Sequence, residues 1–204
     1  MSDLTIEPAA PTTTPGTTRT AKLVTEIFAP WVLILALFLA LGARTGPTGL
    51  AWGLLAATFP SIGPMAVIVR GVLTNRYTDH HLTTRKQRLL PLLLSGLLVI
   101  TGIAVLYLAQ APAPLLAAEV AMLCALLIFT PITAFWKISF HTGVAAAAAT
   151  LLTLTYGPAL SLLSPLVALI GWSRVRLAHH TTTQVIAGAP TGALITALPF
   201  LLIR

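Results

Sequence analysis

Long apolar runs separated by short polar stretches dominate this chain. Five of these runs occupy residues 27–43, 50–69, 89–108, 115–136 and 185–203. Each run has about the length of a helix that crosses a hydrocarbon core, which takes roughly 20 residues. Between residues 143 and 172 the apolar pattern breaks at Gly157 and Pro158, which predicts two short helices. The pattern therefore predicts seven helices, or six if residues 143–172 form one bent segment.

The composition supports an integral membrane protein. Of the 204 residues, 56% are apolar and 8% are charged, and the mean hydropathy is +0.91. A soluble domain of this size does not need so much apolar surface. Helices satisfy their own backbone hydrogen bonds in lipid, whereas open strands do not. We therefore predict an all-α fold, a polytopic membrane helix bundle of six to seven transmembrane helices.

The first 21 residues differ from the rest of the chain. They are rich in Thr and Pro and lack an apolar face, which predicts a disordered tail over residues 1–21 and a helical membrane domain over residues 22–204. The tail does not have the pattern of a signal peptide, because acidic residues precede the basic ones. Cys124 is the only cysteine, which excludes an intrachain disulfide.

The polar residues outside the tail gather in three clusters. These are "NRYTDHHLTTRKQR" at residues 75–88, "WKISFH" at residues 136–141 and "SRVRLAHHTTTQVIAG" at residues 173–188. Two predicted spans separate the first cluster from the second, and two separate the second from the third. An even number of crossings returns the chain to the same membrane face, so we expect all three clusters to meet there.

The same topology explains how the basic residues behind the net charge of +7 are distributed. With seven spans, one face carries Arg19, Lys22, Arg70, Arg76, Arg85, Lys86, Arg88, Lys137, Arg174 and Arg176. Only Arg44 and Arg204 lie on the other face. Lys and Arg accumulate on cytoplasmic loops, so we expect the clusters to face the cytoplasm. We expect the partners to be the bilayer and a lipid, not nucleic acid.

The three clusters are rich in cations and histidines and poor in carboxylates. Guanidinium and ammonium groups bind phosphate oxygens, so the expected ligand is a phosphate at the membrane surface. One histidine can attack phosphorus while another protonates the leaving alkoxide. Outside the tail the carboxylates are only Glu26, Asp79 and Glu119, too few for a magnesium site. The surrounding cations disfavour zinc bound by the histidines, so we expect neither a metal nor another cofactor.

The third cluster resembles the SRxxxxxHxxxD signature of the type 2 phosphatidic acid phosphatase superfamily. Ser173 and Arg174 match its first two residues, and His180 stands at its histidine. The second cluster resembles the family's PSGH motif, reduced to residues 139–141. The first loosely resembles the motif KxxxxxxRP, with Arg88 as its arginine and Leu89 in place of the proline. The resemblance covers roughly residues 75–192.

The resemblance implies a phosphatase mechanism that uses no metal. His180 would attack phosphorus and His141 would protonate the departing alkoxide. The phosphoryl oxygens would be held by Arg174 and by Arg85, Arg88, Lys137, Ser139 and Ser173.

The chain departs from the signature at Gln184, where the family has Asp. One helical turn separates it from His180, so its amide oxygen can accept a hydrogen bond from Nδ1 of that histidine. It cannot supply a negative charge. Asp79 is the only carboxylate in the three clusters, and we expect it to orient a histidine or to clamp a site arginine. His80, His81 and His179 are expected to be bystanders.

These features predict an integral membrane lipid phosphatase acting on a lipid or isoprenoid phosphate or diphosphate. Two alternatives remain open. One is a non-catalytic protein that binds or transports a lipid phosphate, and the other is a phosphotransferase that uses the same site. Taken alone, the first cluster is also typical of a basic loop at lipid headgroups, and "KISFH" of a helix end with a capping serine. Glu119, inside a predicted span, is expected to find an arginine partner or to line a substrate path.

Overall fold

The computed structural model describes residues 15–204, and within this range all regular elements are helical. The α-helices are α1 (Pro15–Ile27), α2 (Pro30–Ala43), α3 (Gly49–Ala57), α4 (Gly63–Leu73), α5 (Leu89–Leu108), α6 (Ala113–Phe135), α7 (Phe140–Tyr156), α8 (Ser164–Arg176) and α9 (Thr182–Ile203). A π-helical turn at Thr58–Ile62 joins α3 to α4, and 3₁₀ turns at Arg85–Gln87 and Pro158–Leu163 precede α5 and α8. The predicted all-α fold is confirmed.

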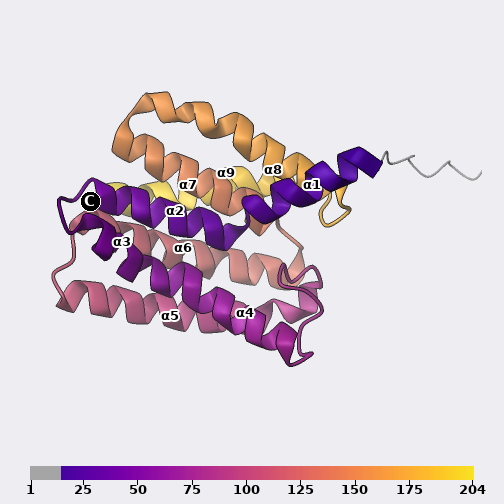
Figure 1. The fold of residues 1–204 in the computed structure, drawn as a ribbon, viewed down its shortest axis with the longest axis horizontal. Coiled ribbons are helices and arrows are strands. Elements are labelled where there is room, and N and C mark those ends of the chain that lie inside the picture. The colour runs from indigo at the N-terminus through magenta and orange to yellow at the C-terminus, as the bar shows by residue number, and fades with distance from the viewer. Residues whose placement is uncertain (1–14) are drawn as a thin grey trace, which may run out of the picture.

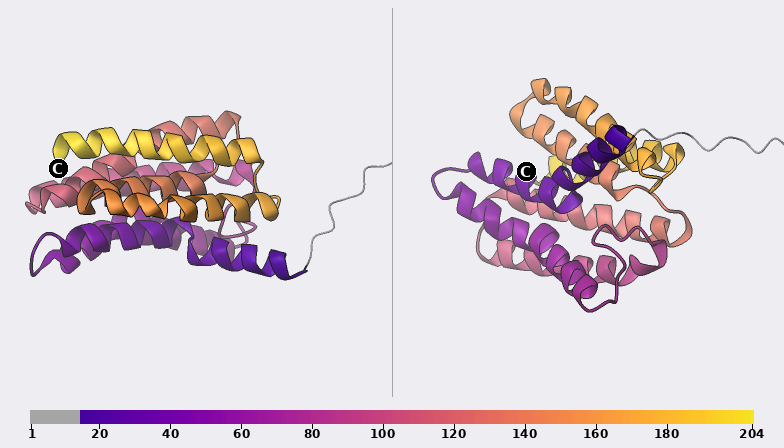
Figure 2. Two further views of the ribbon diagram at one scale, coloured as in Figure 1. Left: turned by 90° about the horizontal axis from the view of Figure 1, so that it is seen from above. Right: turned by 45° about the vertical axis from the view of Figure 1, so that its right-hand side comes forward.

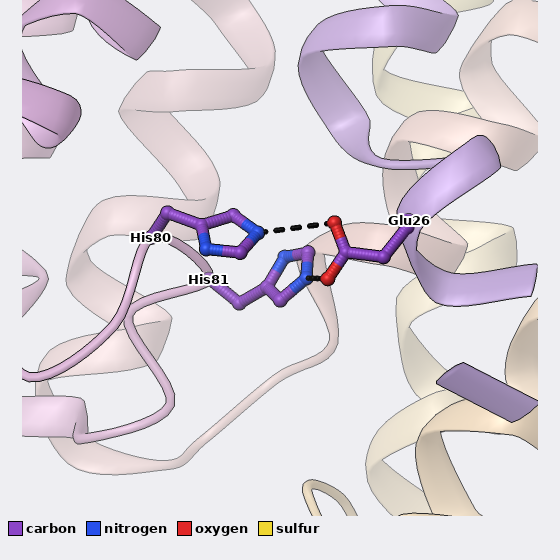
Figure 3. Close-up of side chains that lie close together, drawn as sticks. All are labelled: Glu26, His80 and His81. Carbon is purple, nitrogen blue, oxygen red and sulfur yellow. Dashed lines mark hydrogen bonds and ion pairs between the residues drawn. The ribbon is translucent and has the colours of Figure 1, made fainter. Parts of the chain in front are cut away.

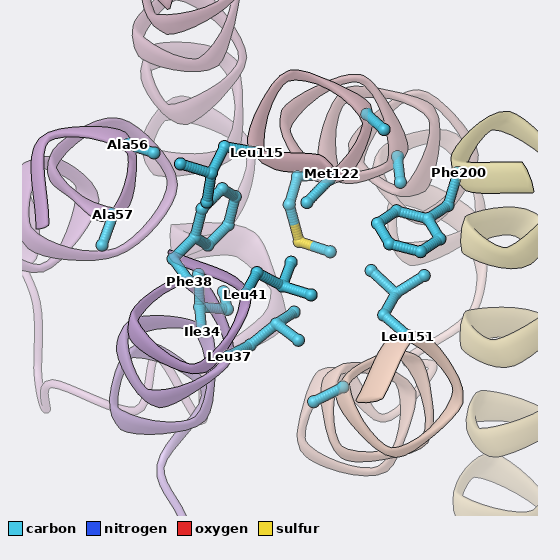
Figure 4. Packing of buried hydrophobic residues seen from close by; sticks show 14 of the residues in the cluster. Ile34, Leu37, Phe38, Leu41, Ala56, Ala57, Leu115, Met122, Leu151 and Phe200 are labelled. Atoms are coloured by element: carbon cyan, nitrogen blue, oxygen red, sulfur yellow. The ribbon is translucent and has the colours of Figure 1, made fainter. Parts of the chain in front are cut away.

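The long helices run along a common axis and form a bundle (Figures 1 and 2). Helix α7 packs against α9 and α2, and α6 packs against α9 and α5. The main apolar core lies where α2, α6, α7 and α9 meet. Phe38, Leu115, Leu151 and Phe200, one from each of these helices, are completely buried there (Figure 4). Burial of such large side chains fixes the positions of the helices that carry the polar clusters.

Within residues 15–204, five helical segments are long and apolar enough to cross a membrane, namely Gly49–Leu73, Arg85–Leu108, Ala113–Phe135, Pro158–Arg176 and Thr182–Ile203. A sixth span arises if α1 and α2, which meet at 45°, are counted as one. Helix α7, with 17 residues, is shorter than all of these. Large apolar side chains such as Leu97 and Leu194 remain exposed on the outside of the bundle, as expected for a surface in contact with lipid.

The predicted break after the alanine-rich segment is confirmed. Helix α7 ends at Gly157, whose φ of 105° is rarely adopted by residues with a side chain, and Pro158 begins the following 3₁₀ turn. The chain then reverses, so that α8 runs back beside α7 (Figure 1). This reversal brings the end of α8 to the same end of the bundle as the start of α7.

Small residues set a very close contact between α9 and α7. A Cβ atom on Gly192 would lie 2.1 Å from the carbonyl oxygen of Gly143, and one on Gly188 would lie 2.6 Å from that of Ser139. Only glycine allows the two backbones to approach this closely. The contact holds the first half of α9 against the first turn of α7, and the start of each helix carries residues of a predicted cluster.

Helix α1 corrects the predicted extent of the tail. The prediction of disorder is wrong for residues 15–21, which are helical, whereas residues 1–14 lie outside the described residues. Ala21, Val24 and Thr25 are buried, and α1 packs against α8. The hydroxyl oxygens of Thr25 and Ser173 are 3.1 Å apart. The helix is stabilised by a partner that lies 148 residues later in the chain, which local composition does not reveal.

Glu119 in α6 is completely buried, and its carboxylate oxygens have no hydrogen-bond partner in the described part of the chain. The expected arginine partner is therefore wrong for residues 15–204. The carboxylate instead lies against Gly102 of α5, where a Cβ atom would come within 2.5 Å of Oε1.

Candidate functional site

The three predicted clusters meet at one end of the bundle. They occupy the connections α4–α5, α6–α7 and α8–α9, which lie beside α1 on the right in Figure 1. Nδ1 of His180 is 3.2 Å from the carbonyl oxygen of Lys137, and Nη1 of Arg88 donates to the carbonyl oxygen of Ile138 at 3.5 Å. The prediction that the three clusters meet is confirmed.

The two cations assigned to the other face lie at the opposite end of the bundle. Arg44 stacks over the ring of Tyr156, with its guanidinium carbon 5.3 Å from the ring centroid. The guanidinium of Arg204 donates to the carbonyl oxygen of Leu154. Both partners belong to the last turn of α7, whose first turn lies at the clusters.

A cavity of about 150 Å³ lies between the clusters and the bundle interior. Its polar wall is formed by His80, His81, Arg88, His141 and His180. A second cavity of about 120 Å³ continues into the bundle and shares the lining residues Pro30, Ile34, Pro60, Leu92 and Phe140 with the first. The arrangement is polar and cationic at one end and apolar towards the membrane interior. It suits a ligand with an anionic head and an apolar tail.

Arg174 is the most unusual side chain of the site. It is 0% exposed, and none of its three guanidinium nitrogens has a hydrogen-bond partner among residues 15–204. A buried charged group without partners is strongly unfavourable. Arg88 is also buried, but its Nε donates to the carbonyl oxygen of Leu82 at 2.8 Å. Two guanidinium groups thus lie where the three clusters meet, and that of Arg174 has no partner among residues 15–204. An anion bound there would supply the missing hydrogen-bond acceptors.

The backbone holds His180 in a defined position. Helix α8 ends in a turn with Ala178 at a φ of 54°, and the amide of His180 donates to the carbonyl oxygen of Arg174 at 3.2 Å. Thr181 then caps α9, and Gln184 completes a capping box. The histidine is thus fixed between the end of one helix and the start of the next.

Gln184 also determines which nitrogen of His180 carries the proton. Its Oε1 is 3.2 Å from the amide nitrogen of Thr181 and 3.1 Å from Nδ1 of His180. The amide of Thr181 can only donate, so Oε1 is an acceptor and Nδ1–H is the donor of the second bond. The contact predicted between Gln184 and His180 is confirmed. It leaves Nε2 of His180 with a free electron pair.

The site favours neutral histidines. Burial, followed by the charges of Arg88 and Arg174, lowers the pKa of His180 to about 3, against the opposing effect of the bond to Gln184. Burial and the charge of Arg174 likewise lower the pKa of His179 to about 4. Burial and the same two arginines also lower the pKa of Lys137, which is half-buried. The electric field at this end of the bundle is therefore strongly positive.

His141 lies in the first turn of α7 and faces the same cavity. Its Nε2 is buried and has no hydrogen-bond partner in the described range, and its ring centroid is 5.3 Å from that of His81. Ser139 is the N-cap of this helix, since its hydroxyl oxygen accepts from the amide of Thr142 at 3.5 Å. The capping interpretation of "KISFH" is confirmed, and it orients the helix that carries His141.

Two predicted phosphate ligands make hydrogen bonds to backbone carbonyl oxygens. Arg85 is exposed and donates to the carbonyl oxygen of Ala134 at 2.7 Å, away from the cavity lining. The hydroxyl of Ser173 donates to the carbonyl oxygen of Ile170 at 2.7 Å and faces α1. Backbone carbonyls engage both side chains and Thr25 of α1 also contacts Ser173, and their assignment as phosphate ligands stays a prediction.

Asp79 shapes a loop instead of clamping an arginine. Its carboxylate accepts from the amides of His81 and Thr83, at 2.9 Å and 3.1 Å, and from the hydroxyl of Thr83. It makes no ion pair with an arginine within residues 15–204. Burial raises the pKa of Asp79, but these hydrogen bonds outweigh that effect and hold the pKa below its ordinary value. Asp79 therefore positions His81 through its backbone amide and not through its imidazole ring.

Sequence reasoning missed the role of Glu26, His80 and His81. Figure 3 shows the carboxylate of Glu26 on α1 facing both histidine rings, with Nε2–oxygen distances of 3.1 Å for His80 and 3.0 Å for His81. Glu26 comes more than 50 residues before the pair. The only local signal was a lone carboxylate near the end of a helix and two adjacent histidines.

Nothing among known protein families, curated proteins and solved structures matches this chain.

Proposed function

We propose that this chain is an integral membrane phosphatase that hydrolyses a lipid or isoprenoid phosphate or diphosphate without a metal at the reacting phosphorus. The observation that carries the proposal is the buried guanidinium of Arg174, which has no hydrogen-bond partner among residues 15–204, together with the buried Arg88 that lines the cavity. Phosphate oxygens are the natural acceptors for such groups, because they accept bidentate, charge-assisted hydrogen bonds. The motif resemblance to the type 2 phosphatidic acid phosphatase superfamily independently suggests the same ligand.

In the proposed reaction His180 is the nucleophile. Its Nε2 electron pair forms a bond to phosphorus, while the bond between phosphorus and the lipid oxygen breaks. His141 gives a proton to that oxygen, and the lipid leaves as an alcohol, or as a monophosphate if the substrate is a diphosphate. His141, now neutral, then takes a proton from a water molecule as its oxygen bonds to phosphorus, while the Nε2–phosphorus bond breaks and inorganic phosphate leaves.

The charges in the site support this sequence of steps. The low pKa of His180 keeps its imidazole neutral, which is the nucleophilic form. A bound phosphate brings negative charge next to His141 and favours protonation of that residue, as a general acid requires. Arg174 and Arg88 would stabilise charge on the phosphoryl oxygens as the bond breaks. Lys137 adds a further positive charge near the site.

The two neighbouring cavities, which share lining residues, support a substrate whose tail enters the bundle. Their shared walls are apolar and come from α2, from the π-helical turn and from α5 and α7. The small combined volume favours a single chain, such as an isoprenoid, at the point where the tail joins the phosphate. By the positive-inside rule we further propose a location in the cell membrane, with the site facing the cytoplasm.

One observation favours a second candidate, a protein that binds or transports a lipid phosphate without hydrolysing it. Gln184 orients His180 but supplies no negative charge to stabilise the imidazolium that forms during turnover. In a serine protease triad, loss of the corresponding charge costs about 10⁴ in kcat. A phosphotransferase would share the first half of the reaction and differ only in the acceptor.

The decisive experiment is phosphate release from a panel of lipid and isoprenoid phosphates by the purified protein in EDTA. We expect activity in the wild type, loss in His180→Ala and His141→Ala, and a trapped phosphohistidine that only His180→Ala abolishes. Release that both variants retain would contradict the mechanism. Binding of the lipids without release would favour the second candidate, and transfer to an added alcohol would indicate the phosphotransferase.

A further inference from the structure

A second cluster with chemistry of its own lies at the rim of the cavity. It consists of Glu26, His80 and His81, and the proposed phosphatase reaction uses none of them. One ligand atom from each of the three residues lies within 4.8 Å of the other two. The carboxylate faces both imidazoles at once, with each oxygen directed at a different Nε2 (Figure 3).

We propose that Glu26, His80 and His81 bind a divalent transition-metal ion of the zinc class, and that this ion fastens α1 to the loop between α4 and α5. Two imidazoles and one carboxylate form a ligand set that zinc uses when one coordination position stays open. Imidazole also suits iron, copper and nickel, but not magnesium or calcium.

The observed distances are close to those that coordination requires. An ion about 2.0–2.2 Å from each ligand, in tetrahedral geometry, separates neighbouring ligand atoms by about 3.3 Å. The Nε2–oxygen distances, 3.1 Å to one carboxylate oxygen and 3.0 Å to the other, are short of this value by a few tenths of an ångström. One ligand atom from each residue also lies within 4.8 Å of the other two, so small shifts bring all three to an ion. The side chains of Glu26 and His80 are 56% and 39% exposed, so small shifts meet little resistance and water can occupy a free coordination position.

The loop that carries the two histidines is held in place before any ion binds. Asp79 accepts hydrogen bonds from the amides of His81 and Thr83, and Leu82 adopts a φ of 48°. The side chain of Gln87 accepts from the amide of Thr78 at 3.1 Å. Rigid support of this kind is what holds metal ligands in a productive geometry. The remaining ligand comes from α1, which is anchored separately on α8.

The positive charge at this end of the bundle disfavours any cation, and for this reason the sequence alone does not predict zinc bound by the histidines. The structure places the negatively charged carboxylate of Glu26, from a distant helix, beside His80 and His81, and this charge favours a cation at these two histidines. His80 and His81 line the cavity, so the ion would lie at its rim. The site is independent of the phosphatase proposal, because the ion takes no part in bond cleavage at phosphorus.

The test uses full-length protein without a polyhistidine tag, purified in detergent, stripped with EDTA and dialysed against limiting zinc. We expect one zinc per chain, and cobalt(II) in its place should give the visible absorption bands of a low-coordinate site. The control variant His179→Ala, which alters a neighbouring histidine outside the cluster, should bind zinc like the wild type. Glu26→Gln and His80→Ala should each weaken zinc binding by at least about tenfold. Loss of a residue that only supports a ligand already weakens metal binding by about 10–100-fold, and loss of a ligand itself should cost at least as much.

His80→Ala keeps the test informative if Glu26→Gln fails to fold, because the side chain of His80 is partly exposed. A wild type that binds no stoichiometric zinc overturns the proposal, as does unchanged affinity in both variants. Loss of zinc in His141→Ala with retention in Glu26→Gln would also overturn it, since the ion would then lie between His81 and His141. Phosphate release by the EDTA-stripped samples tests the phosphatase proposal separately.

Discussion

Replacing Arg174 with methionine should stabilise the protein in the absence of phosphate and abolish its response to phosphate. The side chain is completely buried, and none of its three guanidinium nitrogens has a hydrogen-bond partner within the described residues 15–204. Each buried donor without a partner costs about 1–3 kcal/mol. Exchange of buried charges for apolar groups of similar volume can stabilise a protein by about 1–4 kcal/mol. We therefore expect Arg174→Met to raise the free energy of unfolding by about 1–4 kcal/mol when no phosphate is present.

The same substitution at Arg88 provides the matched control. Arg88 donates to the carbonyl oxygens of Leu82 and Ile138, so Arg88→Met removes hydrogen bonds that the folded protein makes. Hydrogen bonds from a charged donor contribute about 1.5–3 kcal/mol, so we expect Arg88→Met to be destabilising. Two substitutions of the same kind, at two buried arginines of one site, should thus change stability in opposite directions.

The assay is denaturant unfolding of the detergent-solubilised protein, with and without inorganic phosphate. Phosphate at about 100 times its Kd should stabilise the wild type by about 2.7 kcal/mol, because it binds only the folded state. Arg174→Met should show no such increase. The reasoning is refuted if Arg174→Met is less stable than the wild type without phosphate, or if phosphate stabilises both proteins equally.

Three further predictions concern Gln184, His180 and the contact between α7 and α9. Gln184→Glu keeps the length of the side chain and places a charge about 3 Å from Nδ1 of His180, so it should raise the pKa of that histidine by about 1–3 pH units. Titration by NMR measures this, and an unchanged pKa would contradict the orienting role. Because the folded-state pKa of His180, about 3, lies below its ordinary value of 6.5, the unfolded state binds more protons between these values. Stability should therefore fall as pH decreases from about 6.5, and His180→Gln should flatten that curve in unfolding measurements from pH 7 to 5. Gly192→Ala directs a Cβ at the carbonyl oxygen of Gly143 and should cost about 1–3 kcal/mol, whereas Gly96→Ala, with open space around it, should be neutral or stabilising by up to about 1 kcal/mol. Equal melting temperatures for the two alanine variants would show that the helices can move apart.

The helical class and the meeting of the three clusters follow from local information. Apolar runs of membrane-spanning length predict helices without knowledge of their neighbours, since in lipid each helix must satisfy its own backbone. The parity of the spans is enough to place residues 75–88, 136–141 and 173–188 at one end. Spacing along one helical turn also predicts the contact between Gln184 and His180. These features depend on short segments and on the order in which they occur.

Individual side chains at the same end depend on contacts between distant segments. Ser173 and Arg174 are adjacent in sequence, yet the hydroxyl of Ser173 meets Thr25 of α1, whereas the guanidinium of Arg174 has no hydrogen-bond partner within residues 15–204. Arg85 and Arg88 look alike in the sequence, but one is exposed and the other is buried. Glu26 meets His80 and His81 only because α1 packs on α8 and not because of any spacing in the chain. Periodicity and hydropathy predict which segments become helices, but the packing of the bundle decides which polar groups are buried, paired or left open for a ligand.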